Sequence, residues 1–257
     1  MSMNIVVCVK QVPDTAVERM LEPGAGTLDR ESPDGLINEL DEYAIEEGLK
    51  IAEAHGGEVT ILSMGPAKAS ESIRKALSMG ADKAVHVLDD GLAGSDALAT
   101  SLALAQALRQ AGFDLVIFGS ESTDARTGMV PAMVAERLGV PQLTLASKVD
   151  ISGSDVTIRR VSDDGYQVVS GSLPAVVSVV EKINEPRYPT FKGIMAAKKK
   201  PVQVLTLAEL GVAGEVGLQH AATWVEDFAA RPPRSAGVIV KDEGDGGAKA
   251  AGFLAER

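Results

Sequence analysis

The chain has 257 residues, which is enough for one large domain, or one domain with an appendage, that needs no disulfide or metal to hold its core. Its single cysteine, Cys8, excludes an intrachain disulfide. The net charge of −11 disfavours a nucleic-acid-binding protein. No apolar run is long enough to span a membrane, and the N-terminus has no secretory pattern, so we expect a cytoplasmic protein that is not membrane-embedded.

Short apolar strands and amphipathic helices alternate over the first half of the chain. Such alternation predicts parallel strands joined by right-handed helical crossovers. A long polar excursion, residues 10–38, follows the first strand. The predicted strands are 4–9, 59–64, 84–88 and 113–118, and the predicted helices are 39–54, 67–78, one that starts at Ser95-Asp96, and 127–138.

After residue 141 the pattern changes to strands separated by Gly and Ser turns, which predicts a partly antiparallel extension of the sheet. The expected strands are 143–149, 155–161, 166–172, 175–180 and 202–205, with a helix over 194–199, and from residue 213 onward helical and extended patterns are weak. The fold class is therefore α/β, an open, mostly parallel Rossmann-like sheet with helices on both faces. We expect a nucleotide-binding domain over residues 1–230 and a C-terminal arm over 231–257.

Ligands of open parallel sheets bind beyond the carboxyl ends of the strands, where the strand order reverses. This rule selects the segments after Val9, Leu62 and Phe118. The last segment, 119–128, is rich in Gly, Ser and Thr, opens a helix and carries Arg126, a composition that suits a phosphate. It matches neither common phosphate-loop motif, so an ordinary connection remains the alternative.

Residues for catalysis are not apparent in the sequence. The three histidines lie in different segments, and no Cys, His or carboxylate cluster has metal-ligand spacing. Cys8, inside an apolar strand, is expected to be a small core residue. We therefore expect no catalytic residue and no metal site, and a bound cofactor or a partner subunit would perform the chemistry.

A basic segment, residues 181–200, stands out in this acidic chain. It has six basic and two acidic residues, a net charge of +4, and holds Tyr188 and Phe191 between prolines and basic side chains. Exposed aromatic residues with a charged rim are typical of binding surfaces. The alternative is that both rings fold into the core and the lysines form a solvated helix face.

The run from Glu185 to Lys200, Glu-Pro-Arg-Tyr-Pro-Thr-Phe-Lys-Gly-Ile-Met-Ala-Ala-Lys-Lys-Lys, resembles the signature of the electron transfer flavoprotein beta subunit. The stretches 9–14, 38–47, 74–82 and 173–177 are similar to this family in the same order, and the resemblance fades beyond about Gly211. It implies a heterodimer with an alpha subunit that holds most of an FAD, with the C-terminal arm contacting that subunit, and a structural AMP in this chain.

The resemblance also implies which residues bind and which departures matter. Relatives often have Asn-Pro-Phe where this chain has Asn38-Glu39-Leu40, some have an aromatic residue at Thr15, and many have a longer loop after Gly119. In the family, the region around Tyr188 docks a flavin dehydrogenase. The implied cofactor contacts are Cys8, Asn38, Glu39, Leu40, Asp41, Met64, Gly119, Ser120, Glu121, Ser122, Thr123, Asp124, Ala125, Arg126 and Thr127, and the implied docking residues are Arg187, Tyr188, Phe191 and Lys192.

The resemblance implies a redox carrier without catalytic residues of its own. It would accept electrons from acyl-CoA and other flavin dehydrogenases and pass them to a quinone oxidoreductase. Two alternatives stay open: a bifurcating member with a second FAD in place of AMP, and a stand-alone adenine-nucleotide-binding protein.

Overall fold

The computed structural model describes residues 2–229, 231–234, 237 and 239–256. The chain divides into two units, Met1–Glu226 and Asp227–Arg257. The boundary predicted at residue 230 lies outside the described residues. In the smaller unit, helix α6 (Gly246–Ala255) forms where the sequence pattern is too weak to predict one, and none of its residues is buried.

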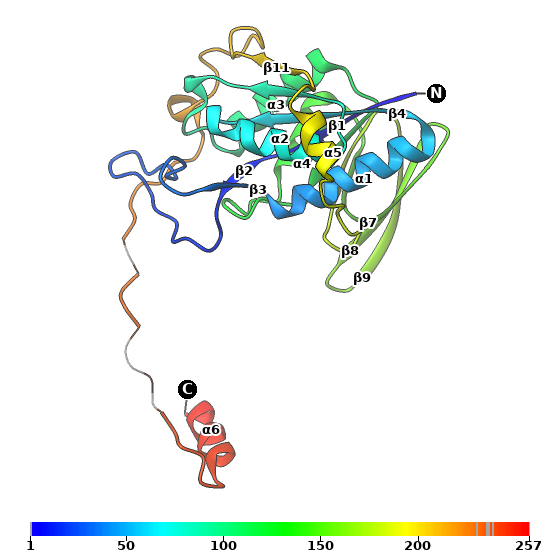
Figure 1. The fold of residues 1–257 in the computed structure, drawn as a ribbon. Helices are drawn as coiled ribbons and strands as arrows, with labels where there is room; N and C mark the ends of the chain where they lie inside the picture. The colour runs from blue at the N-terminus through cyan, green and yellow to red at the C-terminus, as the bar shows by residue number, and fades with distance from the viewer. Residues whose placement is uncertain (1, 230, 235–236, 238, 257) are drawn as a thin grey trace. The chain divides into compact units, whose positions relative to one another are not determined.

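The larger unit is built on an open sheet, as the sequence predicts. Within the described residues this sheet has nine strands in the order β11-β5-β4-β1-β6-β10-β7-β8-β9 (Figure 1). Neighbours from β11 to β7 are parallel, and β7, β8 and β9 are antiparallel. The strands are β1 (Met3–Cys8), β4 (Gly57–Met64), β5 (Lys83–Val87), β6 (Leu115–Gly119), β7 (Gln142–Ser152), β8 (Asp155–Ser162), β9 (Gly165–Ser172), β10 (Ala175–Val179) and β11 (Val202–Leu205).

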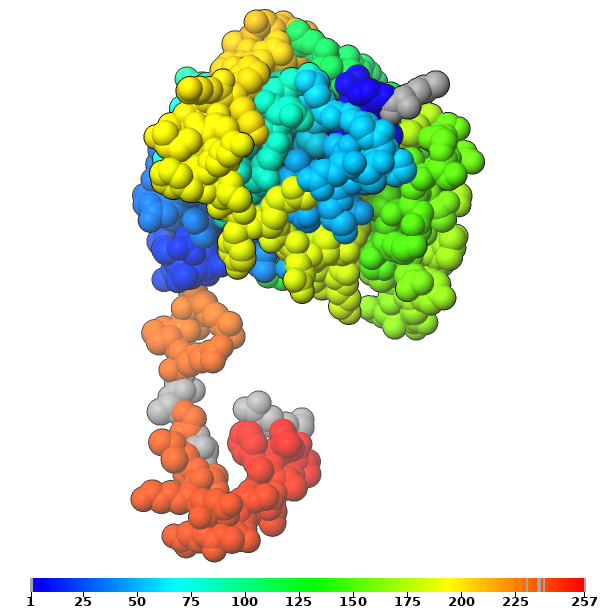
Figure 2. Space-filling view, turned by 45° about the vertical axis from the view of Figure 1, so that its right-hand side comes forward, coloured from blue at the N-terminus to red at the C-terminus, as the bar shows by residue number. Residues whose placement is uncertain are grey.

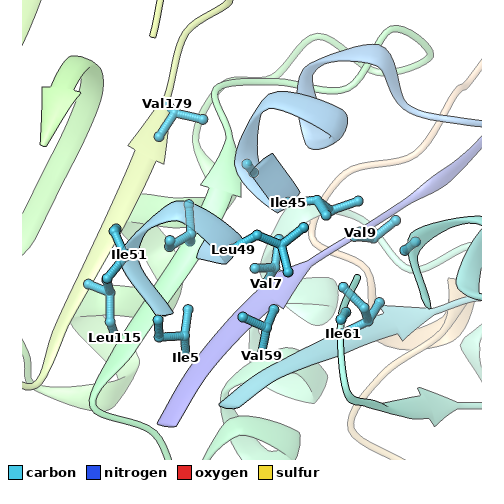
Figure 3. Close-up of a cluster of buried hydrophobic side chains, with 14 of the residues drawn as sticks. Ile5, Val7, Val9, Ile45, Leu49, Ile51, Val59, Ile61, Leu115 and Val179 are labelled. Carbon is cyan, nitrogen blue, oxygen red and sulfur yellow. The ribbon is translucent and has the colours of Figure 1, made fainter. Parts of the chain in front are cut away.

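Side chains of a strand alternate between the two faces of the sheet, and here they are apolar on both. Helices therefore cover both faces. Ile5 and Val7 of β1 pack against Ile45 and Leu49 of the helix above one face (Figure 3), and Val6 belongs to the core on the other face. The helices α1 (Glu39–His55) and α2 (Ser70–Met79) contribute to the first core, and α3 (Ala97–Ala111) and α4 (Val130–Leu138) to the second.

Several helices begin elsewhere than predicted. Helix α2 starts at Ser70 rather than at 67, because a 3-10 turn, Ala67–Ala69, precedes it. Helix α4 starts at Val130 rather than at 127, because Gly128, with φ of +62°, keeps the chain in a loop. Helix α5 (Phe191–Ala197) starts three residues early, because the Thr190 hydroxyl caps it by accepting a hydrogen bond from Gly193 N–H at 3.0 Å. Phe191 is therefore the first residue of a helix.

The excursion after β1 contains structure that the sequence pattern did not predict. The short strands β2 (Gln11–Pro13) and β3 (Gly35–Ile37) form an antiparallel pair, and a single bridge joins Leu21 to Leu28. The pair returns the chain to the edge of the main sheet at Asn38, immediately before α1. Three-residue strands are too short to show a clear alternation in the sequence.

Candidate functional site

The segments selected by the sheet rule lie at one edge of the sheet. Strand β1 lies between β4 and β6, so the strand order reverses at β1. Parallel register brings the carboxyl ends of these three strands together, with Cys8 beside Leu62 and Val7 beside Ile117. The edge is therefore the topological switch point, where such sheets bind ligands.

Asn38 connects the start of α1 to the loop after β6. Its amide nitrogen donates to the Glu121 carbonyl oxygen at 2.9 Å and to Asp41 Oδ1 at 3.0 Å. Its amide oxygen accepts a hydrogen bond from Thr123 N–H at 3.0 Å. The side chain is 1% exposed, so these bonds are shielded from water. Asn38 thereby fixes the path of the backbone through this loop.

Asp41 is a buried carboxylate in the first turn of α1. Its Oδ2 accepts a hydrogen bond from Lys10 N–H at 2.7 Å. The partial positive charge at the N-terminus of α1 also stabilises the carboxylate form. Burial raises the pKa of Asp41 to about 7, against hydrogen bonds from Lys10, Asn38 and Gly119 that lower it. A Cβ at Gly119 would lie 2.5 Å from Asp41 Oδ1, so this position requires glycine.

Asp124 forms the ionic centre of the loop. Its carboxylate pairs with Lys10 Nζ at 2.9 Å and with Arg30 Nη2 at 2.8 Å, although the two cations lie far away in sequence. Burial alone would raise the pKa of Asp124, but the two cations outweigh burial and hold it well below its usual range. The repulsion that Asp124 would exert on a phosphate is therefore neutralised.

Three features of the loop suit an anion. The Thr123 hydroxyl is buried and has no hydrogen-bond partner among the described residues. Helix α4 has Met129 at its N-cap, and no side chain caps its first turn. Backbone N–H groups of this turn are therefore available to a ligand. Arg126 is exposed and has φ of +51°, an uncommon conformation for a residue with a side chain. The segment from Thr123 to Val130 thus contains a hydroxyl without a partner, an exposed guanidinium and a helix start without a side-chain cap.

The other predicted cofactor residues occupy different environments. Cys8 is buried, and burial raises the pKa of its thiol well above the usual value, so its sulfur is a core atom rather than a nucleophile. Met64 ends β4 and packs against the second core. Ser120 is buried, Leu40, Glu121 and Ser122 are half-buried, and Glu39, Ala125 and Thr127 are exposed.

Two residues of this network, Lys10 and Arg30, were not among the predicted site residues. Lys10 follows β1 directly, so the strand-end rule could have selected it. Arg30 lies in the excursion, 94 positions from Asp124, and nothing in the local pattern points to it. Thr15, where some relatives have an aromatic residue, lies exposed in the same excursion.

The basic segment lies on the surface beside α1 (yellow beside blue in Figure 2). Tyr188 and Phe191 are 92% and 82% exposed, which excludes the alternative that their rings enter the core. Lys192 is also exposed. Arg187 differs from them, because its guanidinium is bound by two glutamates of α1.

Two kinds of site were not found in the part of the chain that the structure describes. No group of three or more His, Cys, Asp or Glu side chains could hold a metal ion there. No helix among these residues is long and apolar enough to cross a membrane.

Comparison with known proteins assigns the family. The family model described as "electron transfer flavoprotein domain" matches residues 25–210. A protein of Mycobacterium tuberculosis named electron transfer flavoprotein subunit beta is 54% identical over 258 residues, which cover 98% of this chain and 97% of the relative. The chain belongs to the electron transfer flavoprotein family.

More distant relatives agree with this assignment. The electron transfer flavoprotein subunit beta of Thermoanaerobacterium thermosaccharolyticum is 41% identical and covers 87% of this chain and 86% of its own. Protein FixA of Azorhizobium caulinodans is 39% identical and covers 91% of this chain and 86% of its own. The resemblance to the beta subunit is thereby confirmed, and the chain is an electron-transfer subunit of this family.

Proposed function

We propose that this chain is the beta subunit of a heterodimer whose alpha subunit holds most of a redox-active FAD. The heterodimer accepts electrons from acyl-CoA and other flavin dehydrogenases and passes them to a quinone oxidoreductase. The FAD supplies the electron-transfer chemistry, and this chain supplies a scaffold, a nucleotide site and a docking surface without catalytic residues. The C-terminal arm, residues 231–257, contacts the alpha subunit. The names of the relatives support this proposal.

The nucleotide held by this chain is AMP. The observation that carries this proposal is the buried Thr123 hydroxyl, which has no hydrogen-bond partner among the described residues and lies in a loop whose backbone is bonded to Asn38. A phosphate accepts hydrogen bonds from such a hydroxyl and from helix N–H groups, and Arg126 offers the countercharge. Lys10 and Arg30 pair with Asp124 and so offset the repulsion that its carboxylate would exert on a phosphate.

Nucleotide analysis of the purified heterodimer tests this assignment. Acid extraction and chromatography should release one FAD and one AMP per heterodimer. Two FAD and no AMP would identify the bifurcating alternative, since the second FAD would occupy the same strand-end site. Nucleotide turnover by the isolated chain would instead support the stand-alone nucleotide-binding alternative.

The docking surface is tested at Phe191. Replacing Phe191 with Ala removes an exposed apolar anchor, and loss of such an anchor costs about 1–2 kcal/mol of binding. The KM for the heterodimer as electron acceptor of an acyl-CoA dehydrogenase should rise about five- to thirty-fold, while FAD and AMP contents stay unchanged. Tyr166→Ala, which removes an exposed aromatic ring from β9, is the matched control. Unchanged coupling kinetics in the Phe191 variant would contradict docking at this surface.

A further inference from the structure

The part of the basic segment that precedes its aromatic residues is bound to α1. The Arg187 guanidinium donates to Glu46 at 2.7 and 3.0 Å and to Glu53 at 2.6 and 3.2 Å. Its own backbone N–H donates to Glu46 as well, at 3.1 Å. These hydrogen bonds to Glu46 and Glu53 raise the pKa of Arg187 further above its usual range, so the ion pairs persist at physiological pH.

Asn184 adds a second attachment of the segment to α1. Its amide nitrogen donates to the Tyr43 carbonyl oxygen and to Glu47 Oε2, each at 3.0 Å. Together, Asn184 and Arg187 bind the segment to α1 between Tyr43 and Glu53. Planar forks between arginine and carboxylates fix direction as well as distance, because both partners are rigid and planar.

The other end of the segment is bound to α2. Lys200 Nζ donates to the carbonyl oxygens of Leu77, Gly80 and Ala81 at 2.6–3.2 Å, which satisfies groups that the end of a helix leaves free. Arg74 of α2 donates in return to the carbonyl oxygens of Ala197 and Lys200, at 2.7 and 3.2 Å. Arg74 of α2 and Lys200, three residues after α5, thus each supply a cation to the C-terminal end of the opposite helix.

Helix α5 also packs closely on α2 between these attachments. A Cβ at Gly193 would lie 2.4 Å from the Ser78 carbonyl oxygen, so only glycine allows this approach. Tyr188 and Phe191 nevertheless remain exposed. The chain therefore holds two apolar side chains in water on a backbone fixed at both ends. A preformed surface of this kind saves the entropy of ordering a loop when a partner binds.

We propose that Arg187 is a positioning residue that does not touch the partner. Bound to Glu46 and Glu53, it fixes the direction in which the segment holds Tyr188 and Phe191. It thereby sets how well the heterodimer couples to a flavin dehydrogenase. This inference rests on the proposed docking function. Arg187, expected from the resemblance to contact the partner, instead holds in place the residues that contact it. The positive charge of Arg187 is used within the chain.

The test compares Arg187→Ala and Arg187→Lys with wild type in the heterodimer. Amide hydrogen exchange over residues 188–196 reports the order of the segment without any partner. The KM and kcat for the heterodimer as acceptor of an acyl-CoA dehydrogenase, driven by its acyl-CoA substrate, report coupling. Lys83→Ala is the matched control, because it removes one positive charge from an exposed ion pair with Glu58 outside the segment.

Arg187→Ala should speed exchange over 188–196 about ten-fold and raise the KM about ten-fold, with kcat within two-fold of wild type. Arg187→Lys keeps the charge but loses the fork, so it should give intermediate values of both. Lys83→Ala should change neither. If Arg187→Ala does not fold, Glu53→Gln removes only the exposed half of the pair and should shift both quantities in the same direction by less.

Two outcomes overturn the proposal. A raised KM with unchanged exchange would mean that Arg187 contacts the partner directly. Faster exchange with an unchanged KM would mean that order in the segment does not matter for coupling. Failure of the docking function itself is recognised separately, since Phe191→Ala would then leave the KM unchanged whatever Arg187 does.

Discussion

Asp124 joins the loop after β6 to two distant residues through ion pairs. Its carboxylate is 1% exposed and joins two cations from the excursion and from the end of β1. Removing one member of a buried ion pair leaves charges without a partner and is far more costly than losing an exposed pair. Asp124 therefore links the loop to segments about a hundred residues earlier in the chain.

We predict that Asp124→Asn lowers the stability at pH 7 by about 2 kcal/mol. The depressed pKa in the folded state means that the carboxylate stabilises the fold above about pH 4, and that this contribution is lost as pH falls toward the folded-state pKa. Thermal melts of variant and wild type should therefore differ most at pH 7 and converge on acidification. Asp150→Asn, which breaks an exposed pair with Lys148, should have little effect. A gap in Tm that is independent of pH would exclude this ionic role.

At the scale of elements, the sequence predicts most of the sheet and its helices because long buried strands and amphipathic helices have strong periodic patterns. The strand-end rule also selects the segments after Val9, Leu62 and Phe118, and the parallel register of these strands brings their carboxyl ends together. The start of α5 was wrong by three residues, because a threonine cap rather than periodicity determines it. The pair β2 and β3 was missed because its strands are too short for any pattern.

The internal bonds of the site could not be predicted in the same way. Asn38 and Glu121 are 83 positions apart, and Arg30 and Asp124 are 94 apart. Their pairing depends on how the excursion folds back, which no local pattern in the sequence describes. The role of Arg187 illustrates the same limit: its position in a basic run suggests an outward charge, and only the folded chain shows Glu46 beside it.

For the whole molecule, the charge of the basic segment is divided between interior and surface. Arg187 is neutralised by glutamates and Lys200 binds carbonyl groups, so the charges that face water are those of Lys182, Lys192, Lys198 and Lys199. These four lysines stand on a chain whose total net charge is −11. They form a cationic surface able to attract an acidic partner from a distance.

Coupling to the dehydrogenase should therefore weaken as salt rises. We expect the KM to increase about ten-fold between about 0.05 and 0.5 M ionic strength, because exposed charges are screened over roughly 10 Å and less. Replacing the four lysines with glutamine should raise the KM at low salt and flatten this dependence. AMP retention after gel filtration at each salt concentration serves as the control and should stay constant. A KM that does not respond to salt would contradict electrostatic steering.

The chemical type of these outward charges has a consequence for partner choice. An ammonium group on a four-carbon stem donates in any direction, unlike the planar arginine that this chain keeps for its own scaffold. The lysines thus accelerate association without imposing an orientation on the partner. Selectivity between partners then depends on the shape of the exposed rings of Tyr188 and Phe191. We expect such a surface to tolerate dehydrogenases of different outline, as a shared electron acceptor must.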